Sequence, residues 1–267
     1  MTDKAPHIVA IANQKGGVGK TTTAINLATA LAATGRRTLL IDLDPQGNAS
    51  TGLGFEASQR KPSTYELMLG DVSLESVTRP TAIPNFSLAP SIVDLSGVDV
   101  DLAGRPNRSQ RLRNAIFPSE TASLANGYDE ILIDCPPSLN LLTVNAMAAA
   151  HAVLVPLQCE FFALEGLSQL LNTIERVRRN LNPRLAVEGI VLTMYDRRNN
   201  LSSQVEADVR EALGALVYET VIPRNVRLSE APSHGVPALI YDQVCAGSQA
   251  YQFLAAEFIR RKGKASV

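Results

Sequence analysis

Short apolar runs alternate with amphipathic stretches along most of this 267-residue chain. An unbroken apolar run predicts a buried parallel strand, whereas apolar residues three and four positions apart predict a helix packed on one side. We expect a mostly parallel, twisted sheet with helices on both faces, an α/β fold. The strands are expected at 7–12, 37–43, 86–89, 128–134, 152–157, 185–194 and 217–222, and the helices at 23–34, 64–69, 94–102, 141–150, 162–180, 201–213 and 246–261.

Repeats and Gly/Ser-rich linkers do not divide the sequence. We therefore expect a single domain spanning residues 1–267, with residues 1–6 and about 262–267 as flexible tails. The apolar fraction of 45% is enough for a substantial core, and the charged fraction of 19% is unlike that of a disordered chain.

A glycine-rich loop lies between the first predicted strand and the first predicted helix, and reads Asn-Gln-Lys-Gly-Gly-Val-Gly-Lys-Thr-Thr from Asn13 to Thr22. Glycines let successive backbone N–H groups converge on phosphate oxygens, and the helix N-terminus adds partial positive charge. We expect Lys20 to reach the β- and γ-phosphates and the Thr21 hydroxyl to ligate Mg²⁺. The loop thus predicts a P-loop NTPase-like domain that binds a nucleoside triphosphate, rather than a chance glycine-rich turn.

The loop departs from the strict phosphate-loop pattern in two ways. Gln14 stands where the pattern has its first glycine, and a second lysine, Lys15, precedes the other glycines.

Three aspartates come at the ends of predicted strands. Ligands of open α/β sheets bind beyond the carboxyl ends of strands, so Asp42, Asp44 and Asp134 are expected near the phosphates. Asp42 and Asp44 are separated by one residue, and we expect one of them to address the nucleotide directly; a loop-capping role is the alternative for either. Asp134 ends an apolar run in the manner of a Walker B segment, whose carboxylate holds Mg²⁺, usually through water.

Net charge and cysteine content restrict the classes of function. A net charge of −1 and a pI of 6.3 indicate no general affinity for polyanions, so any nucleic-acid binding requires a local patch. Three widely spaced cysteines, Cys135, Cys159 and Cys245, favour a reducing compartment over a disulfide framework or a zinc site. We find no signal-peptide pattern, and the longest apolar stretch, 139–157, is broken by polar residues. A cytoplasmic protein is expected.

Four segments together resemble the ParA/MinD family of P-loop ATPases, and its ParA branch in particular. The additional lysine of the first segment defines the deviant Walker A motif of that family, and the likeness spans nearly the whole chain. The segments are Lys15–Thr21, Ile41–Asn48, Ile131–Pro137 and Ile222–Pro232.

This resemblance implies an ATP-driven partitioning cycle. ATP binding would produce a sandwich dimer in which Lys15 of each subunit reaches the partner's phosphates, as an arginine finger does in trans. The dimer would bind DNA without sequence preference and leave it after a ParB-type centromere-binding protein stimulates hydrolysis. The implied location is cytoplasmic and nucleoid-associated, without membrane binding. No DNA-reading helix-turn-helix domain precedes the loop in this sequence, which is similar to the short, chromosomal type.

The resemblance also implies a role for individual residues. Asp44 would orient the attacking water, and Lys15 and Lys20 would act with it in catalysis. Arg198 and Arg227 match positions implicated in DNA binding, although the stretch 176–227 has nine arginines against six acids and is only modestly basic, so ordinary solvated arginines are the alternative. The implied nucleotide-binding residues are Lys15, Gly16, Gly17, Val18, Gly19, Lys20, Thr21, Thr22, Met194, Pro223 and Asn225, with Thr21 and Asp134 serving the metal.

Other readings of the sequence stay open. A MinD-like membrane-cycling ATPase would need an amphipathic C-terminal helix, for which Phe253, Leu254, Phe258 and Ile259 are available if they do not pack on the domain. A scaffold that binds nucleotide without turnover is a second class. Reductase relatives that bridge an iron–sulfur cluster would have to use Cys135 and Cys159. The basic end, 260–264, is either a frayed helix end or a DNA contact.

Overall fold

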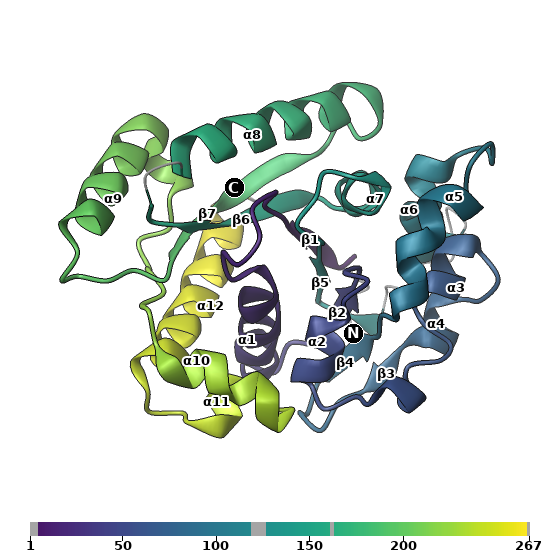
Figure 1. Cartoon of the computed structure of the whole chain (residues 1–267), viewed down its shortest axis with the longest axis horizontal. Coiled ribbons are helices and arrows are strands. Elements are labelled where there is room, and N and C mark those ends of the chain that lie inside the picture. The colour runs from purple at the N-terminus through teal and green to yellow at the C-terminus, as the bar shows by residue number, and fades with distance from the viewer. Residues whose placement is uncertain (1–4, 119–126, 161–162, 266–267) are drawn as a thin grey trace.

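One seven-stranded sheet runs through the computed structural model, with helices on both faces (Figure 1). The structure describes residues 5–118, 127–160 and 163–265. The strand order is β3-β4-β2-β5-β1-β6-β7, and every pair is parallel except β3 with β4. The strands are β1 His7–Ile11, β2 Thr38–Asp42, β3 Arg79–Pro80, β4 Phe86–Ala89, β5 Glu130–Asp134, β6 Ala152–Gln158 and β7 Ala186–Thr193. The predicted α/β fold is confirmed.

Each face of the sheet carries its own core. In β1, Ile8 and Ala10 join the core beneath α7 (Leu141–Ala149) and α8 (Ala163–Asn180). Val9 and Ile11 join the core beneath α1 (Lys20–Ala33) and α12 (Ala246–Ala265). Figure 1 shows these two pairs of helices on opposite sides of the strands. Because successive side chains of a strand point to opposite faces, a strand covered on both faces reads as an unbroken apolar run.

The helices alternate with the strands as expected. The longer ones are α1 Lys20–Ala33, α7 Leu141–Ala149, α8 Ala163–Asn180, α9 Asn200–Leu213 and α12 Ala246–Ala265. The shorter ones are α2 Asn48–Gly52, α3 Thr64–Leu69, α4 Leu74–Val77, α5 Val98–Asp101, α6 Arg111–Ile116, α10 Val226–Glu230 and α11 Ala238–Tyr241, with 3₁₀ turns η1 Ala57–Gln59, η2 Val93–Gly97, η3 Arg108–Gln110, η5 Gly214–Leu216 and η6 Ala231–His234.

Boundaries differ from expectation at several places. The first helix begins at Lys20, inside the glycine loop, because Gly19 adopts a positive φ of 86° and serves as its N-cap. The expected helix at 94–102 is divided into η2 and α5. The last helix continues to Ala265, beyond the expected end at 261, whereas residues 1–4, 266 and 267 of the expected tails lie outside the described residues.

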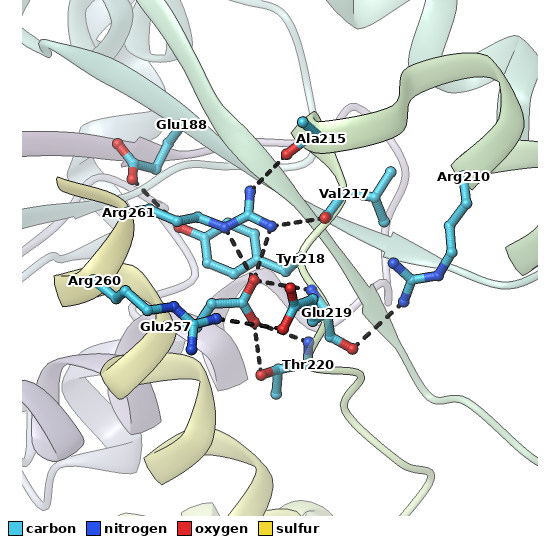
Figure 2. Close-up of polar contacts among 10 residues, drawn as sticks. All are labelled: Glu188, Arg210, Ala215, Val217, Tyr218, Glu219, Thr220, Glu257, Arg260 and Arg261. Carbon is cyan, nitrogen blue, oxygen red and sulfur yellow. Dashed lines mark hydrogen bonds and ion pairs between the residues drawn. The ribbon is translucent and has the colours of Figure 1, made fainter. Parts of the chain in front are cut away.

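The expected strand at 217–222 is wrong. An isolated bridge at Ile190–Val217 and two backbone hydrogen bonds, from Tyr218 to Ile190 and from Ile222 to Leu192, join this segment to β7 without forming a continuous ladder. A second isolated bridge, Tyr195–Pro223, follows just beyond both. The physical reason is that Glu257 of α12 accepts the N–H groups of Glu219 and Thr220, both at 2.9 Å (Figure 2). Backbone donors taken by a side chain cannot form a regular ladder with a neighbouring strand.

Two charged side chains fasten α12 to the segment after α9 (Figure 2). Glu257 also accepts from the Thr220 hydroxyl at 2.8 Å and from Arg261 Nε at 2.9 Å. Arg261 donates to the carbonyl oxygens of Ala215 and Val217 and lies with its guanidinium 4.0 Å from the Tyr218 ring centroid. Burial raises the pKa of Glu257, but these N–H, hydroxyl and guanidinium donors outweigh it and lower the pKa overall.

Candidate functional site

The glycine loop leaves β1 at the centre of the sheet, between β5 and β6, and leads directly into α1. Gly17 and Gly19 both have positive φ, 75° and 86°. The Thr193 hydroxyl, at the end of β7, donates to the Val18 carbonyl at 2.8 Å and holds the loop from one side. The first turn of α1 has no acidic residue and no side-chain cap, so its N–H groups and partial positive charge are available to an anion.

The two lysines of the loop occupy different environments. Lys20 is buried, and its Nζ donates to the Lys15 carbonyl at 2.8 Å. Burial lowers the pKa of Lys20, while nearby acidic groups, Asp134 first, act in the opposite direction. The Lys15 side chain is half exposed and forms an ion pair with Glu160 of the same chain. Lys20 therefore points to the site within its own chain, and Lys15 lies at its surface.

The three predicted aspartates meet at the carboxyl edge of the sheet. Asp42 and Asp134 are direct register partners on the adjacent strands β2 and β5, and both are fully buried. Asp42 accepts from the backbone N–H of Asp44 (3.2 Å) and from Ser50, whose N–H and hydroxyl lie 2.9 and 2.7 Å away. Burial, opposed by these hydrogen bonds, raises the pKa of Asp42 to about 6. Asp42 is thus occupied by its own loop.

Asp134 has the properties of a cation ligand. Neither of its carboxylate oxygens has a hydrogen-bond partner, although both are buried. Burial, and after it the Asp42 carboxylate, holds the pKa of Asp134 well above its usual range, while the Thr21 hydroxyl and Lys20 oppose that shift. Burial of a carboxylate without a hydrogen-bond partner costs free energy. A divalent cation that prefers oxygen ligands would remove this cost by binding the carboxylate. The donor set therefore fits Mg²⁺.

Asp44 lies just beyond the end of β2 and is largely buried. Its Oδ1 accepts from the N–H of Gln46 at 3.0 Å, and its carbonyl accepts from the N–H of Gly47 at 2.8 Å. Asp44 also contributes to the electrostatic environment of both Lys20 and Asp134. Of the two acids that end β2, Asp44 is therefore the one beside the phosphate loop that is not held by Ser50.

Beside the loop is a cavity of about 260 Å³. Gly19 and Thr22 line it together with Met194, Pro223 and Asn225. The structure thus brings these three expected nucleotide-binding residues next to the phosphate loop, although they are far from it in the sequence. Met194 has an unusual positive φ of 50°, and the Asn225 side chain caps α10 by accepting from the N–H of Arg227 at 2.9 Å.

The two arginines expected at DNA are exposed and lie in separate segments. Arg198 is in the loop between β7 and α9, with 89% of its side chain exposed, and it forks onto Asp196 through Nε and Nη2, each at 3.0 Å. Arg227 is in α10 and pairs with Glu230 (2.8 Å) and Asp242 (3.4 Å). Each arginine therefore already has a carboxylate partner within the chain.

The basic end of α12 is also ion-paired where it is described. Arg260 contacts Glu219 at 3.3 Å, and Lys262 contacts the buried Glu130 at 2.8 Å. The side chain of Lys264, the last residue of the expected basic tail, lies outside the described residues.

Glu160 is a site residue that the sequence analysis did not identify. It lies two residues after the end of β6, at the same carboxyl edge of the sheet as the aspartates. The rule that placed the aspartates near the phosphates, applied to β6, would have indicated it.

Cys135 and Cys159, which the iron–sulfur alternative would require as ligands, are buried. Burial raises the pKa of Cys135 well above its usual range and that of Cys159 to about 11. Within residues 5–118, 127–160 and 163–265, no group of three or more His, Cys, Asp or Glu side chains is arranged to hold a metal ion. No helix in those same ranges is both long and apolar enough to span a bilayer.

Residues 6–187 match a family model described as an AAA domain. The chain is 61% identical over 257 residues to the chromosome partitioning protein ParA of Caulobacter vibrioides, which covers 96% of this chain and 95% of that protein. It is 48% identical over 250 residues to the sporulation initiation inhibitor protein Soj of Bacillus subtilis, with 94% and 97% covered. It is also similar to the crystal structure of cobyrinic acid a,c-diamide synthase from Mycobacterium smegmatis with bound ATP analog and magnesium, with a TM-score of 0.83, 36% identity and 97% of both chains covered.

Proposed function

Because this chain belongs to the ParA/Soj family of chromosome-partitioning ATPases, we propose that it binds ATP with Mg²⁺ and cycles between a DNA-bound dimer and a free form. The observation that carries the proposal is the meeting of Lys20, Asp44 and Asp134 where the glycine loop enters α1. The whole chain, residues 1–267, acts as one ATPase domain in this proposal.

ATP binding falls to the loop and to the adjoining cavity. The N–H groups from Gly16 to Thr22 and the uncapped N-terminus of α1 bind the phosphates, and Lys20 neutralises their charge. The cavity lined by Met194, Pro223 and Asn225 receives the adenine. The similar diamide synthase, crystallised with an ATP analog and magnesium, supports both the nucleotide and the metal.

Thr21 and Asp134 would hold Mg²⁺, which when bound neutralises charge on the phosphates. Two protein oxygens are few for this ion, but Mg²⁺ commonly keeps several waters and takes its remaining ligands from the substrate. The two unpartnered oxygens of Asp134 support this role.

Hydrolysis is assigned to Asp44 and Lys15. The Asp44 carboxylate orients a water in line with the γ-phosphoryl group, and such positioning is most of what phosphoryl transfer requires of a protein. Lys15 reaches the phosphates bound by the partner subunit, so that catalysis depends on an ATP-bound homodimer. The exposed location of Lys15 supports an action outside its own chain.

DNA binding without sequence preference is assigned to Arg198 and Arg227. A monomer with a net charge of −1 offers few phosphate contacts, and non-specific affinity rises with the number of phosphates neutralised. Dimerisation doubles the number of arginines presented together, so nucleotide state controls DNA affinity. A ParB-type centromere-binding protein stimulates hydrolysis and so releases the dimer. The protein is accordingly cytoplasmic and nucleoid-associated.

The packing of α12 argues against the MinD-like, membrane-cycling alternative. Leu254 and Phe258 are fully buried against the domain, which leaves Phe253, 65% exposed, as the main apolar side chain toward solvent. Phe253 therefore does not pack on the domain, unlike its neighbours. Pelleting with anionic liposomes, with and without ATP, tests this point, and ATP-dependent pelleting would favour the membrane alternative.

The deciding experiment is DNA binding measured with ATP, ADP and no nucleotide, using unrelated DNA sequences of equal length. We expect tight binding in ATP alone, with equal affinity for every sequence. Equal affinity in all three nucleotide states would contradict the proposed cycle.

A further inference from the structure

The short helix α2 follows the Asp44 loop directly and is fastened on two sides. On its inner side, Ser50 donates to Asp42 through its N–H and hydroxyl, and the Ser50 hydroxyl accepts from the N–H of Ser91 at 3.0 Å. This anchor ties α2 to the end of β2 and to the segment after β4.

On the outer side, a single guanidinium holds four backbone or side-chain oxygens around α2. Arg60 donates through Nε and Nη2 to the Phe55 carbonyl at 3.0 and 2.8 Å. Its Nη2 also donates to the Thr51 hydroxyl at 2.7 Å, and its Nη1 to the carbonyls of Gly47 (3.3 Å) and Ser91 (3.5 Å). The planar fork of arginine suits it to join several acceptors in fixed directions.

The contact with Gly47 connects Arg60 to Asp44. Gly47 has a φ of 61°, and a Cβ placed on it would lie 2.4 Å from Arg60 Nη1 and 3.1 Å from the Ser91 carbonyl oxygen. The guanidinium thus lies directly against the Gly47 backbone. Gly47 in turn donates its N–H to the Asp44 carbonyl at 2.8 Å, which closes the turn that carries the Asp44 side chain.

We infer that Arg60 is a positioning residue for ATP hydrolysis, which fixes the turn from Asp44 to Gly47 so that the Asp44 carboxylate holds its water in line. The inference rests on the proposed role of Asp44. Pro45 fixes one φ angle of this turn, but Gly47 has no side chain to restrain its own backbone, and a displacement of about 1 Å in a catalytic group costs up to about a hundredfold in rate. None of the Arg60 contacts described above is with the phosphate loop or with the residues that line the cavity.

The main experiment compares kcat and KM for ATP in Arg60→Ala and Arg60→Lys. We expect Arg60→Ala to lower kcat by between about ten- and a hundredfold while KM stays within about twofold. Lysine keeps the charge but not the fork, so Arg60→Lys should recover part of the rate. Free guanidinium at millimolar concentration should restore part of the Arg60→Ala rate. An unchanged kcat, or a KM that rises as kcat falls, overturns the inference.

Arg111 supplies the matched control. It is also half-buried and also donates to helix-end carbonyls, those of Met68 (3.0 Å) and Leu69, but at the end of α3. Arg111→Ala should lower the thermal unfolding midpoint without lowering kcat at a temperature well below that midpoint. If both variants lower kcat equally, Arg60 contributes only general stability and the inference fails.

A double-mutant cycle with Asp44 separates the inference from the proposed function. The residual rate of the Asp44→Ala variant is measured by single-turnover hydrolysis of radiolabelled ATP. Adding Arg60→Ala to this variant should change that rate by less than about twofold. A full additive loss in that background overturns the action of Arg60 through Asp44. If Asp44→Ala alone hydrolyses ATP at the wild-type rate, the proposed role of Asp44 fails instead. Should Arg60→Ala not fold, Arg60→Lys in the same cycle gives the same decision.

Discussion

Lys15 and Glu160 of the same chain form an ion pair across the gap between the start of the phosphate loop and the end of β6. In the proposed dimer, Lys15 would exchange this carboxylate for the phosphates of the partner subunit. Both side chains are partly exposed, and exposed ion pairs contribute only about 0–1 kcal/mol. The exchange therefore opposes dimerisation only weakly.

Alanine variants of Lys20 and Lys15 should lose different functions. Lys20→Ala should abolish ATP binding, because a buried cation at the phosphates is lost. Lys15→Ala should keep ATP affinity within a fewfold but lose ATP-dependent dimerisation and turnover, as measured by light scattering and phosphate release. Lys61→Ala is the control, since Lys61 is an exposed lysine paired with Asp94 and should behave as wild type. A Lys15→Ala protein that dimerises and hydrolyses normally would exclude action in trans.

Asp44→Ala should trap the ATP state. Removal of the carboxylate takes away water positioning but leaves the phosphate loop intact, so we expect an ATP-bound dimer with hydrolysis reduced at least about a hundredfold. The variant should stay on DNA in ATP and resist release by a ParB-type protein, as followed by biolayer interferometry. A monomeric variant, or one that no longer binds ATP, would indicate that Asp44 is structural.

Reversal of charge at Arg198 or Arg227 should abolish DNA binding while ATP-dependent dimerisation survives. Changing either residue to alanine should instead weaken binding evenly across sequences and lower the salt slope by about two for the two copies in a dimer. Arg179→Glu is the control, because Arg179 on α8 is similarly exposed and paired with Glu175. Wild-type binding by the double variant Arg198→Glu, Arg227→Glu would place the patch elsewhere.

Removal of the negative charge of Asp196, which pairs with Arg198, should strengthen DNA binding. The Arg198 side chain, and next its N–H, lowers the pKa of Asp196 to about 2, so the carboxylate stays charged at any pH used for DNA binding. Asp196→Asn keeps an oxygen that can accept from the Arg198 N–H but removes the charge that competes with phosphate. We expect DNA affinity to rise by up to about fivefold per subunit. Unchanged affinity in a filter-binding titration would show that the pair has no influence on DNA.

The hydrogen bonds of Glu257 should make the free energy of unfolding depend on pH in the acid range. The folded pKa of Glu257 is lowered, so its stabilisation is present above the unfolded pKa of about 4.3 and is lost as pH falls through the folded pKa. Glu257→Gln should lower the free energy of unfolding by about 2 kcal/mol at pH 7 and by less at pH 3. Urea unfolding at both pH values measures this difference, and an equal loss at both would reject the assignment.

The parts of the fold and site that sequence predicted are local. The order strand, glycine loop, helix lies within residues 7–34, and Asp134 directly follows three apolar residues at the end of β5, so neighbouring residues suffice to identify both. The span Thr64–Leu69 begins after Ser63, whose side chain and that of Glu66 form a capping box, a signal readable in four consecutive residues.

The parts that sequence did not predict depend on distant residues. The segment at 217–222 has the composition of a strand, yet Glu257, almost forty positions later, takes two of its backbone donors. The sequence offers one apolar face made of Phe253, Leu254, Phe258 and Ile259. The buried side of α12 follows the spacing of Tyr251, Leu254 and Phe258, and Phe253 lies outside that stripe. The contacts of Arg60 likewise connect residues that no local pattern relates.

The two edges of the sheet are protected against strand pairing with other copies of the chain. An edge strand with free N–H and C=O groups is a template on which another chain can add a strand and aggregate. Here β3 is two residues long and includes Pro80, which has no N–H to offer, and the segment after η5 covers β7 with N–H groups from Tyr218 and Ile222. In the proposed DNA-bound state, copies gathered along one DNA molecule would therefore meet through helices and loops rather than by adding strands to each other's sheets.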